Sequence, residues 1–143
     1  MINCLSGISS TAAALNAERV RLDVIGENIA NAQTTRTATG KPYQRQQVVF
    51  ESILQHQGTD PLNAQPSAVQ VARVEADPRP PQLVYNPGHP DADAHGLVAM
   101  PNVNVHQEMA DLIVASRAFE ANLAVVHNAR SMALQSLNIG KRG

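Results

Sequence analysis

The residues of this chain that are best suited to chemistry fall in one short segment. His89, Asp91, Asp93 and His95 alternate at every second position. Imidazoles and carboxylates are zinc ligands, and a catalytic zinc site combines three protein ligands with one open position. The spacing matches no metal motif, however, and the neighbouring prolines are typical of a surface loop. A metal-dependent enzyme is therefore a disfavoured interpretation, and we expect no catalytic residue, no metal and no cofactor.

Other functional classes leave no signal in the sequence. No nucleophile-elbow sequence and no glycine-rich loop after a strand is present. The single cysteine, Cys4, excludes an internal disulfide. A net charge of −1, with acids and bases interspersed, gives no basic footprint for nucleic acid. The sequence has no apolar run near 18 residues and no leader-like start, so we expect neither membrane insertion nor a cleaved secretory signal.

Composition and proline placement divide the chain into three parts. Aromatic residues make up 3% of the chain, with no Trp, so Ala, Val, Leu and Ile must supply the packing surface. All nine prolines lie between Pro42 and Pro101. A proline inside a helix costs about 3 kcal/mol or more. Long helices are therefore permitted at both ends and disfavoured in the middle.

The N-terminal part predicts one amphipathic helix. Residues at positions 8, 12, 15, 19, 22, 26 and 29 are separated by alternating steps of four and three, which place them on one helical face. The pattern predicts a helix from about residue 9 to 31, with Ser9, Ser10 or Thr11 as its cap, and an earlier start stays open. The apolar members that we expect at an assembly interface are Ile8, Leu15, Leu22 and Ile29.

The C-terminal part carries a longer stripe of the same kind. It predicts a helix from about 104 to 139, capped by Asn104 and on the order of 50 Å long, which favours a coiled-coil-like element. Ser116 and Arg130 interrupt the stripe, either because the stripe drifts around the helix or because they face a polar surface of an assembly. The expected interface residues are Val105, Met109, Leu112, Phe119, Leu123, Val126 and Leu137.

The middle part has β character. Short apolar runs at 48–50, 69–74 and 83–85 are separated by turn signals at 58–61, 77–81 and 86–90. They predict a small β domain. The expected fold is mainly α with a small β insert: residues 1–33 and 104–143 form a discontinuous domain of paired helices, and 34–103 form a proline-rich β and loop insert.

Several motifs together resemble a known family. Asn28-Ile29-Ala30-Asn31 resembles a signature near the N-terminus of bacterial flagellar axial proteins, which include rod, hook and hook-associated subunits. The segments Pro87-Gly88-His89-Pro90 and Pro101-Asn102 narrow the resemblance to the proximal rod proteins. Gln33, where the family would have Asn, is a mild departure.

The resemblance implies a structural role. Such a subunit would assemble helically with copies of itself and with other rod subunits around an export channel, and would transmit torque from motor to hook. It would leave the cytoplasm unfolded through the flagellar type III export apparatus and reside in the basal body, between the inner and outer membranes. The alternatives are another flagellar axial or junction subunit, a cytosolic coiled-coil adaptor and, least favoured, the metal-dependent enzyme.

Overall fold

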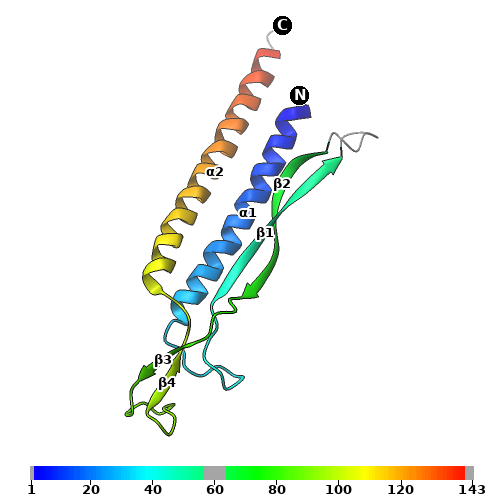
Figure 1. The fold of residues 1–143 in the computed structure, drawn as a ribbon. Helices are drawn as coiled ribbons and strands as arrows, with labels where there is room; N and C mark the ends of the chain where they lie inside the picture. The colour runs from blue at the N-terminus through cyan, green and yellow to red at the C-terminus, as the bar shows by residue number, and fades with distance from the viewer. Residues whose placement is uncertain (1, 57–63, 141–143) are drawn as a thin grey trace.

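The computed structural model describes residues 2–56 and 64–140, which form two long helices and two β-hairpins (Figure 1). In chain order the elements are α1 (Ile2–Ala30), β1 (Gln46–His56), β2 (Ala64–Ala76), β3 (Gln82–Tyr85), β4 (Leu97–Met100) and α2 (Val105–Gly140). The expected fold class, terminal helices around a β insert, is confirmed at this level. The turn signal at 58–61 lies outside the described residues.

The helix boundaries differ from the sequence prediction mainly at the start of the chain. α1 begins at Ile2, so Ser9, Ser10 and Thr11 lie inside the helix and do not cap it. The Thr11 hydroxyl instead donates a hydrogen bond to the Gly7 carbonyl 2.8 Å away, as hydroxyls inside helices often do. Asn104 does cap α2, because its Oδ1 accepts from the His106 amide at 3.1 Å.

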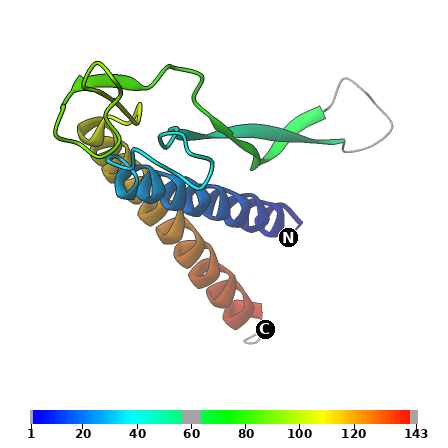
Figure 2. The same cartoon turned by 90° about the horizontal axis from the view of Figure 1, so that it is seen from below.

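The two helices pack antiparallel, and α1 forms the middle layer. α2 lies along one side of α1 and the β1–β2 hairpin along another (Figures 1 and 2). Seen from below, the helices are closest near the start of α2 and diverge toward their free ends (Figure 2). Ala17, Val24, Ile25 and Ala115 are buried. The small side chains at Ala17 and Ala115 allow a close approach of the backbones.

The β1–β2 hairpin is antiparallel and long. Its register runs from Gln46 opposite Ala76 to His56 opposite Ala64, with shifts after Val49 and after Ile53. Such bulges bend a strand and increase its twist. The hairpin therefore curves along α1 over much of the helix (Figure 1).

The β3–β4 hairpin forms a separate tip beyond the end of the helix pair. β4 contributes the buried Val98, whereas Leu83, Val84 and Tyr85 of β3 are exposed. The expected β insert is present, and its described strands form two sheets of two strands each. The longer hairpin packs against α1 but leaves Phe50, Val69 and Val74 exposed, and the second hairpin takes no part in its sheet.

Candidate functional site

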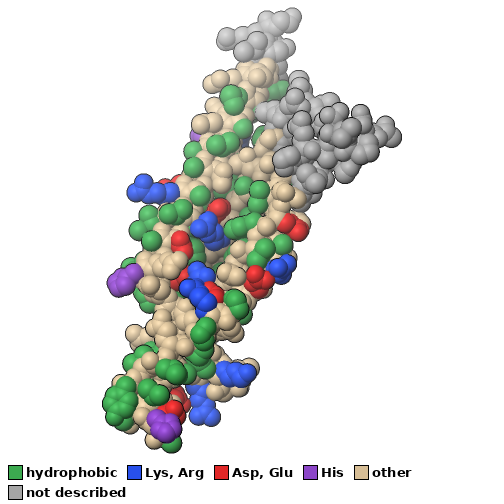
Figure 3. All heavy atoms as spheres, viewed as in Figure 1, with side chains coloured by type: hydrophobic (Ala, Val, Ile, Leu, Met, Phe, Trp, Pro, Cys, Tyr) green, Lys and Arg blue, Asp and Glu red, His purple; other side chains and the backbone are tan. Residues whose placement is uncertain are grey.

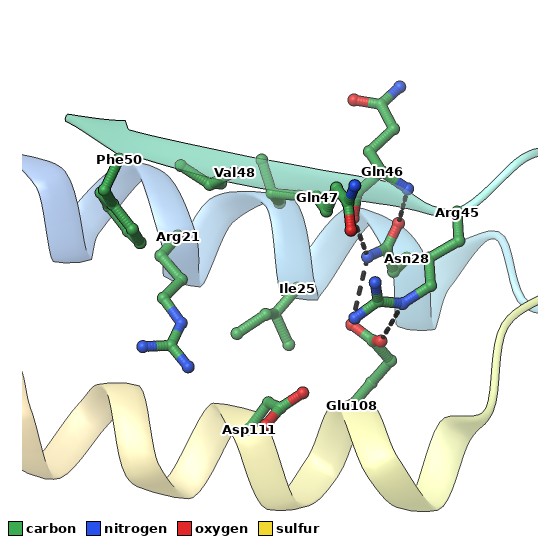
Figure 4. Close-up of a pocket in the computed structure, with 11 residues that line it drawn as sticks. Arg21, Ile25, Asn28, Arg45, Gln46, Gln47, Val48, Phe50, Glu108 and Asp111 are labelled. Atoms are coloured by element: carbon green, nitrogen blue, oxygen red, sulfur yellow. Dashed lines mark hydrogen bonds and ion pairs between the residues drawn. The ribbon is translucent and has the colours of Figure 1, made fainter. Parts of the chain in front are cut away.

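A buried polar cluster occupies the point where the long hairpin leaves the helix pair. Five side chains from five segments meet there, and we call them the junction cluster: Asn28, Arg45, Asp77, Asn102 and Glu108. Figure 4 shows Asn28 of α1, Arg45 just before β1 and Glu108 of α2 pointing toward one another. Asp77 directly follows β2, and Asn102 precedes α2. The cluster thus joins all the segments that must be arranged around the hairpin base.

Asn28 uses the full hydrogen-bonding capacity of its amide. Its Oδ1 accepts from the Gln46 backbone N–H and from the Tyr43 hydroxyl, both at 2.9 Å. Its Nδ2 donates to the Gln46 carbonyl at 2.8 Å and to Glu108 Oε2 at 3.1 Å. An amide offers two donors and two acceptor positions, so the set is complete. Asn28 is 1% exposed. Its amide pairs with both the N–H and the carbonyl of Gln46, the first residue of β1, as the backbone of a neighbouring strand would.

Glu108 is the most deeply buried charge of the described chain. Its side chain belongs to the first turn of α2, and the residue is 0% exposed. Arg45 Nε donates to its Oε1 at 2.7 Å, while its Oε2 receives the Asn28 amide. A buried carboxylate is tolerated only when a counter-charge and hydrogen bonds compensate its lost hydration. Both oxygens of Glu108 are compensated in this way.

Asp77 continues the row of alternating charges. One of its oxygens lies 3.6 Å from Arg45 and 2.6 Å from Arg79 Nη2. The Arg79 guanidinium, helped by the Arg79 backbone N–H, lowers the Asp77 pKa from 3.8 to about 2. In return, Asp77 raises the pKa of Arg79. Glu108, Arg45, Asp77 and Arg79 thus form a line in which each charge neighbours an opposite one.

Asn102 closes the cluster from the side of the short hairpin. Its Oδ1 accepts the Arg45 backbone N–H at 2.8 Å, and its Nδ2 donates to the Arg79 carbonyl at 3.0 Å. The Asp77 backbone N–H donates to the Arg45 carbonyl at 2.7 Å. Backbone groups that the strands leave unpaired at the hairpin base are therefore satisfied by side chains and by one another.

A groove of about 350 Å³ opens beside the cluster, between β1 and the two helices (Figure 4). Ile25 lies at its centre, with Val48 and Phe50 along the strand and Arg21 and Asp111 on the helices.

Burial, followed by the charges of Glu27 and Glu108, raises the pKa of the nearby Tyr43 hydroxyl. The polar groups of the junction cluster bind one another and nearby backbone groups. This arrangement favours a structural role, in which the cluster holds the hairpin base against the helices.

The loop residues that could have held a metal accept hydrogen bonds from nearby backbone N–H groups and, at Asp91, from a side-chain hydroxyl. His89 Nδ1 accepts from the Asp91 N–H at 3.1 Å. Asp93 Oδ1 accepts from the His95 and Leu97 N–H groups at 2.8 and 2.9 Å. Asp91 accepts from Thr35 at 2.8 Å. Within 2–56 and 64–140, no group of three or more His, Cys, Asp or Glu side chains is placed to bind a metal ion.

The family-motif residues separate into two places. Asn28, Asn102 and the buried Pro101 belong to the junction, although they are far apart in sequence. Pro87, Gly88, His89 and Pro90 lie in the tip loop between β3 and β4. Ile29, Ala30 and Asn31 lie at the end of α1, and Asn31 accepts a hydrogen bond from the Thr34 hydroxyl at 3.2 Å.

The predicted stripe on α2 is split between the buried and exposed sides of that helix. Leu112, Phe119 and Val126 are half-buried, whereas Val105, Met109, Leu123 and Leu137 are exposed, Leu123 by 53%. Ser116 is half-buried and Arg130 is exposed, as expected if the stripe drifts. The less exposed positions form a second line that shares Leu112, Phe119 and Val126 with the predicted stripe. Its members are Glu108, Leu112, Ala115, Phe119, Asn122, Val126, Ala129 and Ala133.

Apolar side chains are also exposed beyond the predicted stripe. They include Ile113, Val114, Val125, Met132 and Leu134, so α2 is apolar on the side that faces away from α1 as well (Figure 3). On α1 the predicted Ile8, Leu15, Leu22 and Ile29 are half-buried. We call the exposed apolar residues of α2 the open face of α2. They are Val105, Met109, Ile113, Val114, Leu123, Val125, Met132, Leu134 and Leu137.

Three members of the junction cluster escaped the sequence reasoning: Arg45, Asp77 and Glu108. The pairings of Arg45 and Asp77 depend on hairpin geometry, which local sequence does not reveal. Glu108 carried a signal in the sequence, because Leu112, Ala115, Phe119 and Val126 follow it on one helical face, and a carboxylate on such a face needs a partner.

Comparisons with known proteins agree on one family. Residues 9–36 match the family described as flagella basal body rod protein, and residues 94–139 match the flagellar basal body rod FlgEFG protein C-terminal family. The flagellar basal-body rod protein FlgC of Borreliella burgdorferi is 42% identical, over 94% of this chain and 95% of its own length. FlgC of Bacillus subtilis is 39% identical over 94% and 96%, and FlgC of Yersinia enterocolitica 41% over 90% and 91%.

Neither α1 nor α2, as far as the structure describes them, is apolar enough over a sufficient length to cross a bilayer.

Proposed function

This chain belongs to the flagellar basal-body rod proteins of the FlgC type, and on that premise we propose how its surfaces build the rod. It is a structural subunit of the proximal rod of the flagellar basal body. The relatives are structural proteins, consistent with a role without catalysis. Such a role requires a surface for neighbouring subunits, a set of partners and a route to the site of assembly.

The open face of α2 is the surface that we assign to contacts between subunits. Leu123, Val125, Met132 and Leu137 are each more than half exposed in the single chain. Burying apolar surface contributes roughly 25 cal/mol per Å². Neighbouring subunits that cover this face would therefore gain substantial free energy. This exposed apolar face is the observation that carries the proposal.

The arrangement fits an inner domain of helices and an outer insert. In this proposal, residues 1–33 and 104–143 pack in a coiled-coil-like manner with their neighbours, while residues 34–103 face outward. The α2 face of one subunit and the different surface it meets on the next make a head-to-tail contact, which produces a helical filament when it does not close into a ring. Such a filament leaves room for an axial export channel.

The proposed partners are other copies of this chain, other rod subunits and the flagellar type III export apparatus, which would deliver the chain unfolded to a site between the two membranes. A face that stays exposed until neighbours arrive suits this route, since ordering is then coupled to assembly.

A single substitution on the open face tests the proposal. Leu123→Asp places a charge where a neighbour would pack, and burying an unpaired charge costs several kcal/mol. We expect the variant chain to be exported but not incorporated, so that motility and basal-body rods are lost. Leu123→Met, which keeps the apolar surface, is the control and should swim normally. Normal swimming of the Leu123→Asp strain would show that this face is not an assembly surface.

A further inference from the structure

We propose that Asn28 and Glu108 are positioning residues through which the docking of α2 onto α1 fixes the β1–β2 hairpin in place. The hairpin and α2 lie on different sides of α1 (Figure 2). Their link at the hairpin base runs through the junction cluster, where Glu108 of α2 meets both Arg45 and Asn28. This inference concerns contacts within one subunit and goes beyond its place in the rod.

Glu108 reinforces the orientation of the Asn28 amide that pairs with Gln46. A carboxylate only accepts hydrogen bonds, so it requires the NH₂ group of Asn28 on the side of α2. That choice turns Oδ1 toward the Gln46 N–H and the Tyr43 hydroxyl. An amide rotated by half a turn would present oxygen to two acceptors, the Gln46 carbonyl and Glu108. The carboxylate on α2 and the backbone of Gln46 therefore favour the same orientation of the Asn28 amide, so docking of α2 strengthens the pattern that Asn28 offers to the first residue of β1.

Arg45 provides the second connection. Its guanidinium donates to Glu108 at 2.7 Å, while its backbone N–H and carbonyl are held by Asn102 and by Asp77. Arg45 is therefore fixed at both ends, in the backbone by the hairpin base and at the side chain by α2. When α2 is undocked, Arg45 loses its closest partner and Asn28 loses one acceptor. The hairpin base is then held by fewer bonds.

Thermodynamic linkage makes the coupling reciprocal. If docking of α2 favours the docked hairpin by some factor, the docked hairpin favours helix pairing by the same factor. Couplings of this kind range from about 5-fold to 150-fold. We expect a factor of about 10 here, because two charge-assisted contacts join the two elements.

Amide hydrogen exchange on the full chain tests this coupling by region. Glu108→Gln should raise exchange in 46–52 and 68–76 about tenfold, with the β3–β4 tip unchanged. Glu120→Gln, at an exposed position of the same helix, is the matched control and should change nothing. An equal rise in every region, tip included, or no rise in the hairpin, would overturn the proposal.

The reciprocal direction uses a variant outside the cluster. Val48→Ala weakens the seating of β1, so it should raise exchange at the start of α2, in 105–119. In the Glu108→Gln background the same substitution should have little effect there, because the link is already broken. Equal effects of Val48→Ala in both backgrounds would contradict a coupling through Glu108.

Rescue in cells provides a measurement that does not depend on the isolated chain being folded. Asn28→Asp sets a carboxylate against Glu108 and against the Gln46 carbonyl, so we expect motility to be lost. Adding Glu108→Gln supplies an amide donor opposite the new carboxylate and should restore part of the motility. If the double variant swims no better than Asn28→Asp alone, Asn28 and Glu108 do not act as a pair.

Discussion

The two ends of the helix pair differ in how far their side chains are buried within the chain. At the junction end, Asn28, Glu108 and Ala115 are almost fully buried, and the polar groups find partners within the chain. The open face of α2 already begins at Val105 beside the junction, but toward the free end α1 and α2 also diverge, and the exposed apolar residues there have few buried neighbours within the chain (Figures 2 and 3). The difference teaches that one chain can be complete at one end and unfinished at the other. The finished end fixes the subunit's shape, and the unfinished end is available to neighbours.

The largest effect on the single chain should come from the finished end. Arg45→Met leaves Glu108 and Asp77 buried with fewer counter-charges, which should lower the free energy of unfolding by about 3 kcal/mol. Urea denaturation of the purified chain measures this directly.

Two control variants sharpen the comparison. Arg73→Met removes the exposed Arg73–Glu75 pair and should cost at most about 0.5 kcal/mol. Leu123→Asp, drastic for assembly, should change the stability of the single chain by no more than about 0.5 kcal/mol, because its position is open to solvent. A large loss of stability in Leu123→Asp would erase the distinction between the two ends.

An intermediate effect should appear in acid. Because the Asp77 pKa is lowered from 3.8 to about 2, the contribution of its ionised form to stability is present above about pH 4 and is lost as the pH falls toward 2. Urea midpoints measured between pH 5 and pH 2 should therefore fall in the parent chain. Asp77→Asn should start less stable and show a shallower fall over this range. An unchanged slope in Asp77→Asn would mean that other carboxylates determine the acid sensitivity.

A small effect on both stability and motility should come from the tip loop. Replacing His89 and His95 together by Ala removes one side-chain hydrogen bond, from the Asp91 N–H to His89, and should alter stability by about 1 kcal/mol or less. Motility should persist, since Pro87, Gly88 and Pro90 keep the turn chemistry. Loss of motility together with loss of bound zinc would instead support a structural metal in this loop.

The sequence predicted the elements better than their mutual arrangement. Proline placement and the steps of four and three located both helices, because these signals are local. The start of α1 was left open, since Ser9 to Thr11 suit a cap while nothing before Ser9 forbids a helix, and the structure places it at Ile2. The β insert was predicted, but its division into two sheets was not, because strand pairing is nonlocal: β1–β2 packs on α1, a partner that the insert itself does not reveal.

The functional residues divide in the same way. Asn28 and Asn102 were identified through a family resemblance, but their meeting at one point depends on the folded chain. Glu108 and Arg45 could not be paired from sequence, since 63 residues separate them. The apolar residues of α2 were recognised as a stripe, yet local periodicity could not tell which of them α1 covers and which remain exposed.

The bond between Asn28 and Glu108 spans 80 positions of the chain, and this separation has a kinetic consequence. Contacts between distant residues form slowly, because the loop between them must lose its freedom before any contact compensates. α1 can therefore reach its final packing only after the chain has emerged as far as Glu108 from whatever delivers it. Any earlier packing of the strands on α1 would be reversible. The arrival of α2 would therefore limit the rate at which the whole chain reaches its folded structure.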